Sequence, residues 1–182
     1  MKATDHLMKD HKYILRALNV LEQMAEAADR GEPVVAHEVE DILQFLQLFA
    51  DRHHQGKEES ILFPAILQDG HQGEYPKLCH MVFEHNQERS LVEGLEDSLR
   101  TKKTRDFVHF AGRLVHILRT HIYKEDHILF ELADSILSPA TDELVARELE
   151  DFERSWRQTV FTGLLHKPLL KWMLIAWDGK LC

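Results

Sequence analysis

The sequence has little cysteine, glycine or proline, and it has no long uninterrupted hydrophobic run. Among 182 residues there are two cysteines, eight glycines and five prolines. Two cysteines cannot build a disulfide framework, which indicates a reducing compartment. Residues 1–6 carry no apolar stretch, so we expect no secretory signal and a cytoplasmic protein. The most apolar part, residues 160–177, is interrupted by charged residues and a proline, so we expect no transmembrane segment.

The chain also lacks an excess of basic charge. Its net charge is −9 and no basic stripe occurs, which argues against a nucleic-acid partner. Hydrophobic residues at 44% and charged residues at 29% are typical of a soluble globular protein. Histidine is the residue present in unusual number, with thirteen copies, several of them inside apolar helical patterns.

Apolar residues recur at helical spacing through the first 135 residues, and no strand pattern competes. We expect helices from about residue 4 to 29, 35 to 63, 75 to 100 and from 104, with Pro64 ending or kinking the second. Four such helices with short connections predict an all-α, up-down-up-down antiparallel four-helix bundle in residues 1–137. A shorter fifth helix should follow Ser138 and Pro139. Residues 138–182 then form a C-terminal helix and apolar tail, packed on the bundle or used as an interface.

One stretch occurs twice. Residues 54–63 and 121–130 both fit the pattern H-x-x-K-E-[E/D]-x-I-L-F. On a helix, a histidine and a glutamate four residues apart lie on the same face, where they can reach one metal ion or two adjacent ones. A single pair of this kind is common on helix surfaces, but two copies in matching apolar frames are a strong signal.

Each of the four predicted helices places a histidine at a core-facing position, and two helices add a glutamate one turn later. The six candidate metal ligands are His11, His54, Glu58, His85, His121 and Glu125. A buried carboxylate without a partner costs several kcal/mol, and a metal ion compensates for that cost. Six ligands are too many for a structural zinc site. They suit two first-row ions that share carboxylates inside a bundle.

Other histidines and carboxylates compete for these roles. His80 and Glu84 form a third pair at the same spacing, but His85 lies in register with the apolar stripe of its helix, so we expect His80 and Glu84 to be dispensable. His6 lies off the stripe of its helix and should be solvated. Six further side chains fall on flanking faces, where we expect them to support the site or to be solvated: His53, Glu59, His109, His116, Asp126 and His127.

The pattern resembles the hemerythrin-like (HHE cation-binding) proteins of bacterial type. The residues that carry the resemblance are 10–11, 49–64, 84–85 and 121–130, and it covers about residues 4–135. Met81 stands where the marine oxygen carriers have a further histidine. The resemblance implies a four-helix bundle around a non-haem di-iron centre, with two iron ions, or zinc or manganese in the protein as isolated. It also implies the six ligands His11, His54, Glu58, His85, His121 and Glu125.

Three classes of function remain open at this point. The first is a protein that binds or senses O₂, NO or peroxide, or iron itself. The second is a redox enzyme that handles peroxide or NO at the metal centre. The third is a partner-binding bundle, with residues 160–177 as a contact to a second copy or another protein.

Overall fold

The computed structural model describes residues 2–163, and for residues 159–163 it describes the backbone alone. These residues form helices and turns and no strand, which confirms the predicted all-α class. The α-helices are α1 (Ala3–Asp29), α2 (Ala36–Phe45), α3 (Phe63–Gln68), α4 (Tyr75–Arg100), α5 (Thr104–Lys124), α6 (Phe130–Ile136) and α7 (Pro139–Gly163). Three π-helical segments, η1 (Leu46–Gln55), η2 (Glu58–Leu62) and η4 (Glu125–Leu129), and a 3₁₀ turn, η3 (Gln72–Glu74), complete them.

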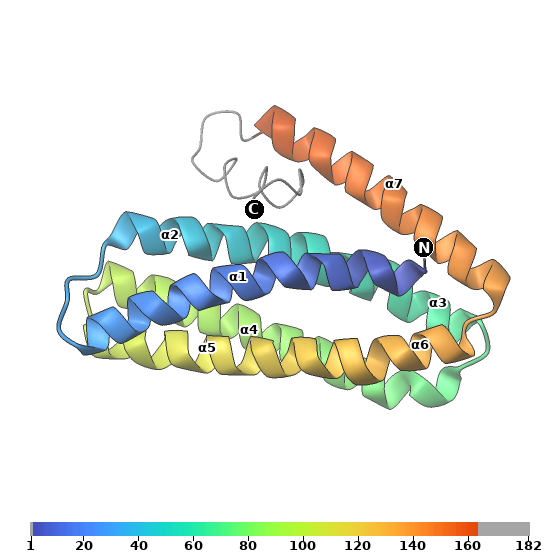
Figure 1. Cartoon of the computed structure of the whole chain (residues 1–182), viewed down its shortest axis with the longest axis horizontal. Coiled ribbons are helices and arrows are strands. Elements are labelled where there is room, and N and C mark those ends of the chain that lie inside the picture. The colour runs from blue at the N-terminus through green and yellow to red at the C-terminus, as the bar shows by residue number, and fades with distance from the viewer. Residues whose placement is uncertain (1, 164–182) are drawn as a thin grey trace.

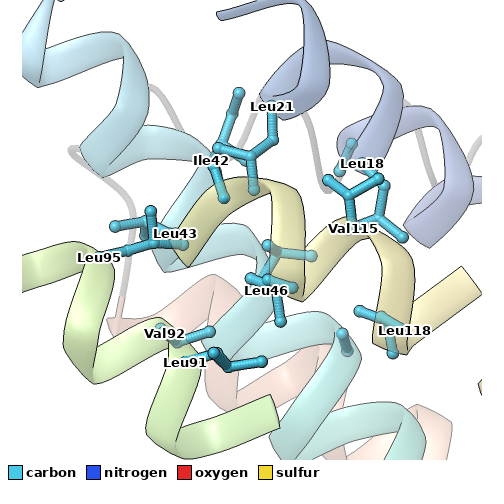
Figure 2. Close-up of a cluster of buried hydrophobic side chains, with 14 of the residues drawn as sticks. Leu18, Leu21, Ile42, Leu43, Leu46, Leu91, Val92, Leu95, Val115 and Leu118 are labelled. Atoms are coloured by element: carbon cyan, nitrogen blue, oxygen red, sulfur yellow. The ribbon is translucent and has the colours of Figure 1, made fainter. Parts of the chain in front are cut away.

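Four long helical stretches lie side by side (Figure 1). The stretch that starts with α2 packs against α1 and α4, and α5 packs against both α1 and α4. Every stretch contributes apolar residues to a first buried cluster (Figure 2), which includes Leu18, Leu43, Leu95 and Val115. Burying each such side chain stabilises the fold by about 1.5–3 kcal/mol.

A second buried cluster lies toward the other end of the helices and includes Leu7, Leu62, Leu78 and Leu129. Along three of the four stretches the candidate metal ligands fall in the sequence between the residues of the two clusters. On the α5 stretch Glu125 does so, and His121 directly precedes Ile122, the last residue of the first cluster. The fold therefore places a polar layer between two apolar cores, and this layer contains the site.

The second helical stretch does not end near Phe63, which was one of the two outcomes predicted from Pro64. The chain changes from π-helix to α-helix at Phe63 and continues to Gln68. Pro64 occupies the first turn of α3, directly after η2. Proline is tolerated at this position because the first N–H groups of a helix lack partners within it.

The fifth helix, α7, is shorter than α1 and α4 as predicted, but only slightly, with 25 residues against 27 and 26. After Pro139 the sequence offers no glycine or proline before Gly163, so nothing interrupts the helix. The Ser138 hydroxyl accepts a hydrogen bond from the backbone N–H of Thr141 at 3.2 Å and caps its start. The carboxylate of Asp69 accepts from the Ser138 N–H at 2.8 Å, which ties α7 to the turn after α3.

Helix α7 packs on α1 and η2, where Val145 and Leu149 are buried (Figure 1). Most of the apolar tail, residues 164–182, lies outside the described residues, so its proposed role as an interface stays a prediction, as does a division of the chain at residue 137. Between residues 2 and 163, no helix is long and apolar enough to cross a membrane.

Candidate metal centre

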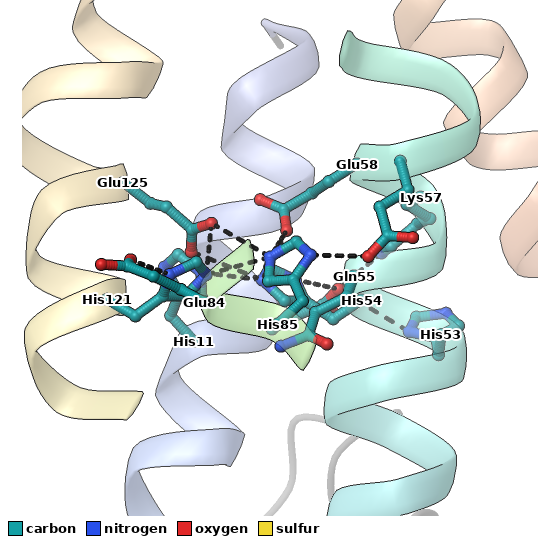
Figure 3. A network of polar contacts seen from close by, with 12 residues as sticks. His11, His53, His54, Gln55, Lys57, Glu58, Glu84, His85, His121 and Glu125 are labelled. Carbon is teal, nitrogen blue, oxygen red and sulfur yellow. Dashed lines mark hydrogen bonds and ion pairs between the residues drawn. The ribbon is translucent and has the colours of Figure 1, made fainter. Parts of the chain in front are cut away.

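The six side chains predicted as metal ligands converge in the polar layer between the two cores. They come from α1, η1, η2, α4, α5 and η4, and Figure 3 shows them pointing toward one another. None is more than 2% exposed. Sequence periodicity therefore identified the right face of each helix at all six positions.

The ligand atoms form two groups that could each bind a metal ion. One contains Glu58, His85, His121 and Glu125, and the other contains His11, His54 and Glu125. The two oxygens of Glu125 face different groups, because Oε1 lies 2.8 Å from His121 Nε2 and Oε2 lies 3.1 Å from His11 Nε2. Glu125 therefore belongs to both candidate groups.

A second glutamate lies on the opposite side of the same space. Glu58 Oε2 is 3.4 Å from His85 Nε2 and 3.8 Å from His54 Nε2. Those two histidines belong to different groups. Glu58 therefore approaches ligands of both groups, as Glu125 does.

The other nitrogen of each ligand histidine lies near a carboxylate. Asp126 Oδ1 lies 2.7 Å from His11 Nδ1, and Glu59 Oε1 lies 2.6 Å from His85 Nδ1. The remaining two contacts are Glu84 to His121 at 2.9 Å and Asp10 to His54 at 3.4 Å. A carboxylate at Nδ1 fixes the tautomer in which Nδ1 donates its hydrogen, which leaves the Nε2 lone pair facing the centre.

Each of these four carboxylates adjoins a candidate ligand in the sequence. Each is the direct neighbour of a ligand on a different helical stretch, as Asp10 is of His11 and Glu59 is of Glu58. A single helix thus contributes a ligand to the centre and a carboxylate that orients another helix's ligand. The arrangement couples the positions of all four helical stretches.

The donor set fits a cation. With their Nδ1 atoms donating, two pairs of Nε2 lone pairs face each other, His11 to His54 at 2.9 Å and His85 to His121 at 3.1 Å. All four carboxylate oxygens of Glu58 and Glu125 are buried without a hydrogen-bond partner. Buried acceptors in such close contact are costly unless positive charge lies among them, and a metal ion supplies that charge.

When no metal is bound, protons on the histidines supply part of this positive charge. Burial opposes the charge on His11, but the Asp126 and Glu125 carboxylates raise its pKa to about 9. Burial is likewise outweighed at His121, where Glu125 and Glu84 raise the pKa to about 10. The surrounding glutamates raise the pKa of His85 to about 12 against the same burial. A metal ion must therefore displace protons from these histidines.

Cationic side chains lie behind three of the orienting carboxylates. Lys57 Nζ donates to Asp10 at 2.5 Å, and Arg89 donates to Glu59 at 2.9 Å. Lys124 donates to Glu84. Lys57 and Lys124 are the lysines of the two repeated stretches, so the repeat encodes this outer layer of charge as well as the ligands.

The two glutamate ligands begin equivalent π-helical segments. Glu58 is the first residue of η2 and Glu125 is the first of η4, each five residues long. Such π turns are uncommon and occur mostly at functional sites. The repeated sequence thus forms the same local backbone twice.

The expectation for His6 is wrong, and those for Glu84 and His53 are refined. Glu84 contacts His121 and Lys124, so it adjoins the site, whereas His80 is largely exposed as expected. That both residues are dispensable for metal binding stays a prediction. His6 is 8% exposed rather than solvated, because α7 covers it and places Glu150 3.8 Å from its ring. His53 is fully buried against Phe49 and the aromatic side chains of α7, and its Nδ1 lies 3.7 Å from Asp10, so of its two expected roles the solvated one is excluded.

The remaining flanking residues behave as predicted. Glu59 and Asp126 support the site through His85 and His11, while three histidines are exposed: His109, His116 and His127. Asp10, Gln55 and Glu88 are buried polar residues to which sequence reasoning assigned no role of their own. The position of Asp10 directly before a ligand was the available signal, since Glu59, Glu84 and Asp126 also adjoin ligands.

Comparison with known proteins agrees with this geometry. Residues 2–133 match the model of the hemerythrin HHE cation-binding domain, and the match covers more than half of the chain. The chain therefore belongs to the hemerythrin family, and cation binding is the property that this domain implies. Searches of curated proteins and of solved structures gave no match. The match ends before α7 begins at Pro139.

Proposed function

We propose that this member of the hemerythrin family binds two iron ions in the polar layer of the bundle and uses them to bind or sense a small ligand such as O₂, NO or peroxide. The observation that carries the proposal is the position of Glu125, whose two oxygens belong to two separate groups of buried ligands. A carboxylate that serves two groups of ligands suits a pair of ions better than one.

The donor chemistry supports iron. The ligand atoms are imidazole nitrogens and carboxylate oxygens, and no thiolate lies among them, which is a set that suits iron, manganese and zinc. An iron pair supplies open coordination positions and a reversible change of oxidation state. The protein's part is to fix Nε2 of each histidine toward the centre through the carboxylates at Nδ1.

Burial limits the ligand to small molecules. The six metal-binding side chains are at most 2% exposed and lie between two apolar cores, so a bulky substrate has no access to them. We further propose that the four helical stretches form the up-down-up-down antiparallel bundle, because its packing from all four sides is what encloses the centre.

Metal analysis combined with optical titration tests the proposal. We expect two iron ions per chain after anaerobic loading, and a change in the absorption spectrum when O₂, NO or hydrogen peroxide is added. A reversible change indicates ligand binding, whereas continuous consumption of peroxide or NO indicates a redox enzyme. Glu125→Gln should reduce the iron content, while the exposed control His116→Gln should not. Failure to bind iron under these conditions would overturn the proposal.

A further inference from the structure

A cavity of about 250 Å³ lies between η1, α4 and α5, next to the metal centre. Apolar side chains form much of its wall: Leu46, Ala50, Val92, Leu114 and Leu118. Since one water molecule occupies about 30 Å³ in the liquid, the cavity has room for a few small molecules. Exposed Arg52 and Glu93 also line it, so it reaches toward solvent.

Two buried polar residues line the same cavity. Gln55 is 2% exposed and Glu88 is 4% exposed, and Gln55 Nε2 lies 2.5 Å from Glu88 Oε2. Gln55 directly follows the ligand His54, and Figure 3 shows it close to the ligand side chains. Glu88 lies one helical turn beyond the ligand His85. The Glu88 carboxylate also interacts electrostatically with His85, His121 and Glu125, so the pair adjoins both the cavity and the metal centre.

Each of these residues has a side-chain oxygen without a partner. Oε1 of Gln55 and Oε1 of Glu88 are buried and accept no hydrogen bond. Leaving one such acceptor unsatisfied costs about 1–3 kcal/mol. Because the terminal torsions of glutamine and glutamate are broad, either group can turn its free oxygen toward the cavity without changing rotamer. Both oxygens can therefore accept hydrogen bonds from a donor in the cavity.

Ion pairs and a hydrogen bond connect the outer part of the cavity to the metal centre. Arg89 lines the cavity and donates to Asp51 at 2.7 Å and to Glu59 at 2.9 Å. Glu59 in turn holds His85 Nδ1 at 2.6 Å. The position of this wall is therefore linked to the position of a metal ligand.

We propose that this cavity binds hydrogen peroxide, or a small uncharged molecule with the same O–H donors, and that the free oxygens of Gln55 and Glu88 accept its hydrogens before it reaches the centre. This inference rests on the proposed function and names the ligand class of that site. O₂ and NO have no hydrogen to donate, and apolar walls disfavour a charged ligand. The pair thus selects peroxide over the diatomic gases.

Rapid-mixing measurements on the iron-loaded protein test the role of Glu88, with hydrogen peroxide and NO as separate probes. Glu88→Leu should slow the reaction with peroxide at least tenfold and leave the association rate of NO unchanged. Glu88→Gln keeps an acceptor oxygen, so it should slow the reaction with peroxide less than Glu88→Leu does. Equal effects on both probes, or no effect on peroxide, would overturn the selection by Glu88.

The route is tested by filling the cavity. Val92→Phe should slow the reactions with both hydrogen peroxide and NO. Val82→Phe makes the same change on the same helix but next to a different cavity, and it should slow neither reaction. If Val82→Phe alone slows them, ligands enter elsewhere.

Xenon provides a readout that needs no metal. Crystals of the metal-free protein under xenon pressure should show a xenon atom in this cavity for the wild type and none for Val92→Phe. No xenon in the wild type would refute the cavity as a binding site, even if iron analysis supports the di-iron centre. Xenon binding without iron binding would instead refute the proposed function, while the cavity would stand as a binding site.

Discussion

The two lysines of the repeated stretches should contribute very differently to stability, although they occupy equivalent positions. Lys57 and its partner Asp10 are 1% and 5% exposed, and their charged atoms are 2.5 Å apart. Lys124 is 29% exposed and its partner Glu84 is 12% exposed. Replacing each lysine with methionine keeps an unbranched apolar side chain, one atom shorter, and removes the charge and its hydrogen bond.

For Lys57→Met we expect a loss of about 3–5 kcal/mol, the usual cost of removing one partner of a buried ion pair. Protonation of Asp10 limits the loss to about 4 kcal/mol at pH 7, because each unit between the pH and a normal aspartate pKa costs about 1.4 kcal/mol. For Lys124→Met we expect about 0–1 kcal/mol, as for an exposed pair. In melting temperature, a loss of 3–4 kcal/mol corresponds to roughly 6–16 °C for a chain of this size.

The pH dependence of the stability loss in Lys57→Met tests whether the loss comes from the unpaired charge of Asp10. Despite burial, Lys57 and the neighbouring histidines hold the pKa of Asp10 well below its usual value of 3.8. A depressed pKa stabilises the fold at pH values above 3.8, and this stabilisation is lost as the pH falls through the folded pKa. Without Lys57 the pKa of Asp10 rises, so the difference between wild type and Lys57→Met should shrink between pH 7 and pH 4.

Urea unfolding followed by circular dichroism, on metal-free and iron-loaded protein at both pH values, measures these differences. Equal losses for Lys57→Met and Lys124→Met would refute the argument from burial. A Lys57→Met penalty that does not change with pH would refute the assignment of the cost to the charge of Asp10.

Three further results are expected. His85→Ala should lose at least one metal ion by metal analysis, while His80→Ala should retain both, since only His85 faces the centre; the reverse result would mean that the helix is wrongly oriented. Metal-free protein should melt well below the loaded form, and Glu58→Gln should narrow that gap by removing a buried charge; calorimetry showing equal melting temperatures would count against a buried site. The pKa values of His11 and His121 are raised to about 9 and 10, which stabilises the metal-free fold below pH 6.5, and this stabilisation is lost as the pH rises through the raised values. Metal-free protein should therefore be more stable at pH 6 than at pH 10. Metal binding in unbuffered solution should release protons.

Helical periodicity was sufficient to predict the four long helical stretches and the face that each turns inward. His85 was chosen over His80 on this ground, and the structure buries His85 and exposes His80. The repeat was sufficient to pair the glutamates with the histidines. A pattern that repeats along one helix specifies its buried face, and this is why all six side chains were correctly predicted to be buried.

Features that depend on contacts between helices were not predictable from one sequence. Glu84 appeared to belong to an exposed pair with His80, because its contact with His121 crosses from α4 to α5. The choice between a buried and a solvated His53 stayed open because its environment is provided by Phe152 and Trp156 of α7. The π turns were missed because an i,i+4 pair also lies on one face of an α-helix, so the sequence pattern is the same for both.

Anomalous diffraction at the iron edge, from crystals of the iron-loaded protein, tests the central claim most directly. Two peaks are expected, one bounded by Glu58, His85, His121 and Glu125 and the other by His11, His54 and Glu125. The carboxylate of Glu125 should contact both ions. A single peak, or two peaks that do not share Glu125, would contradict the account.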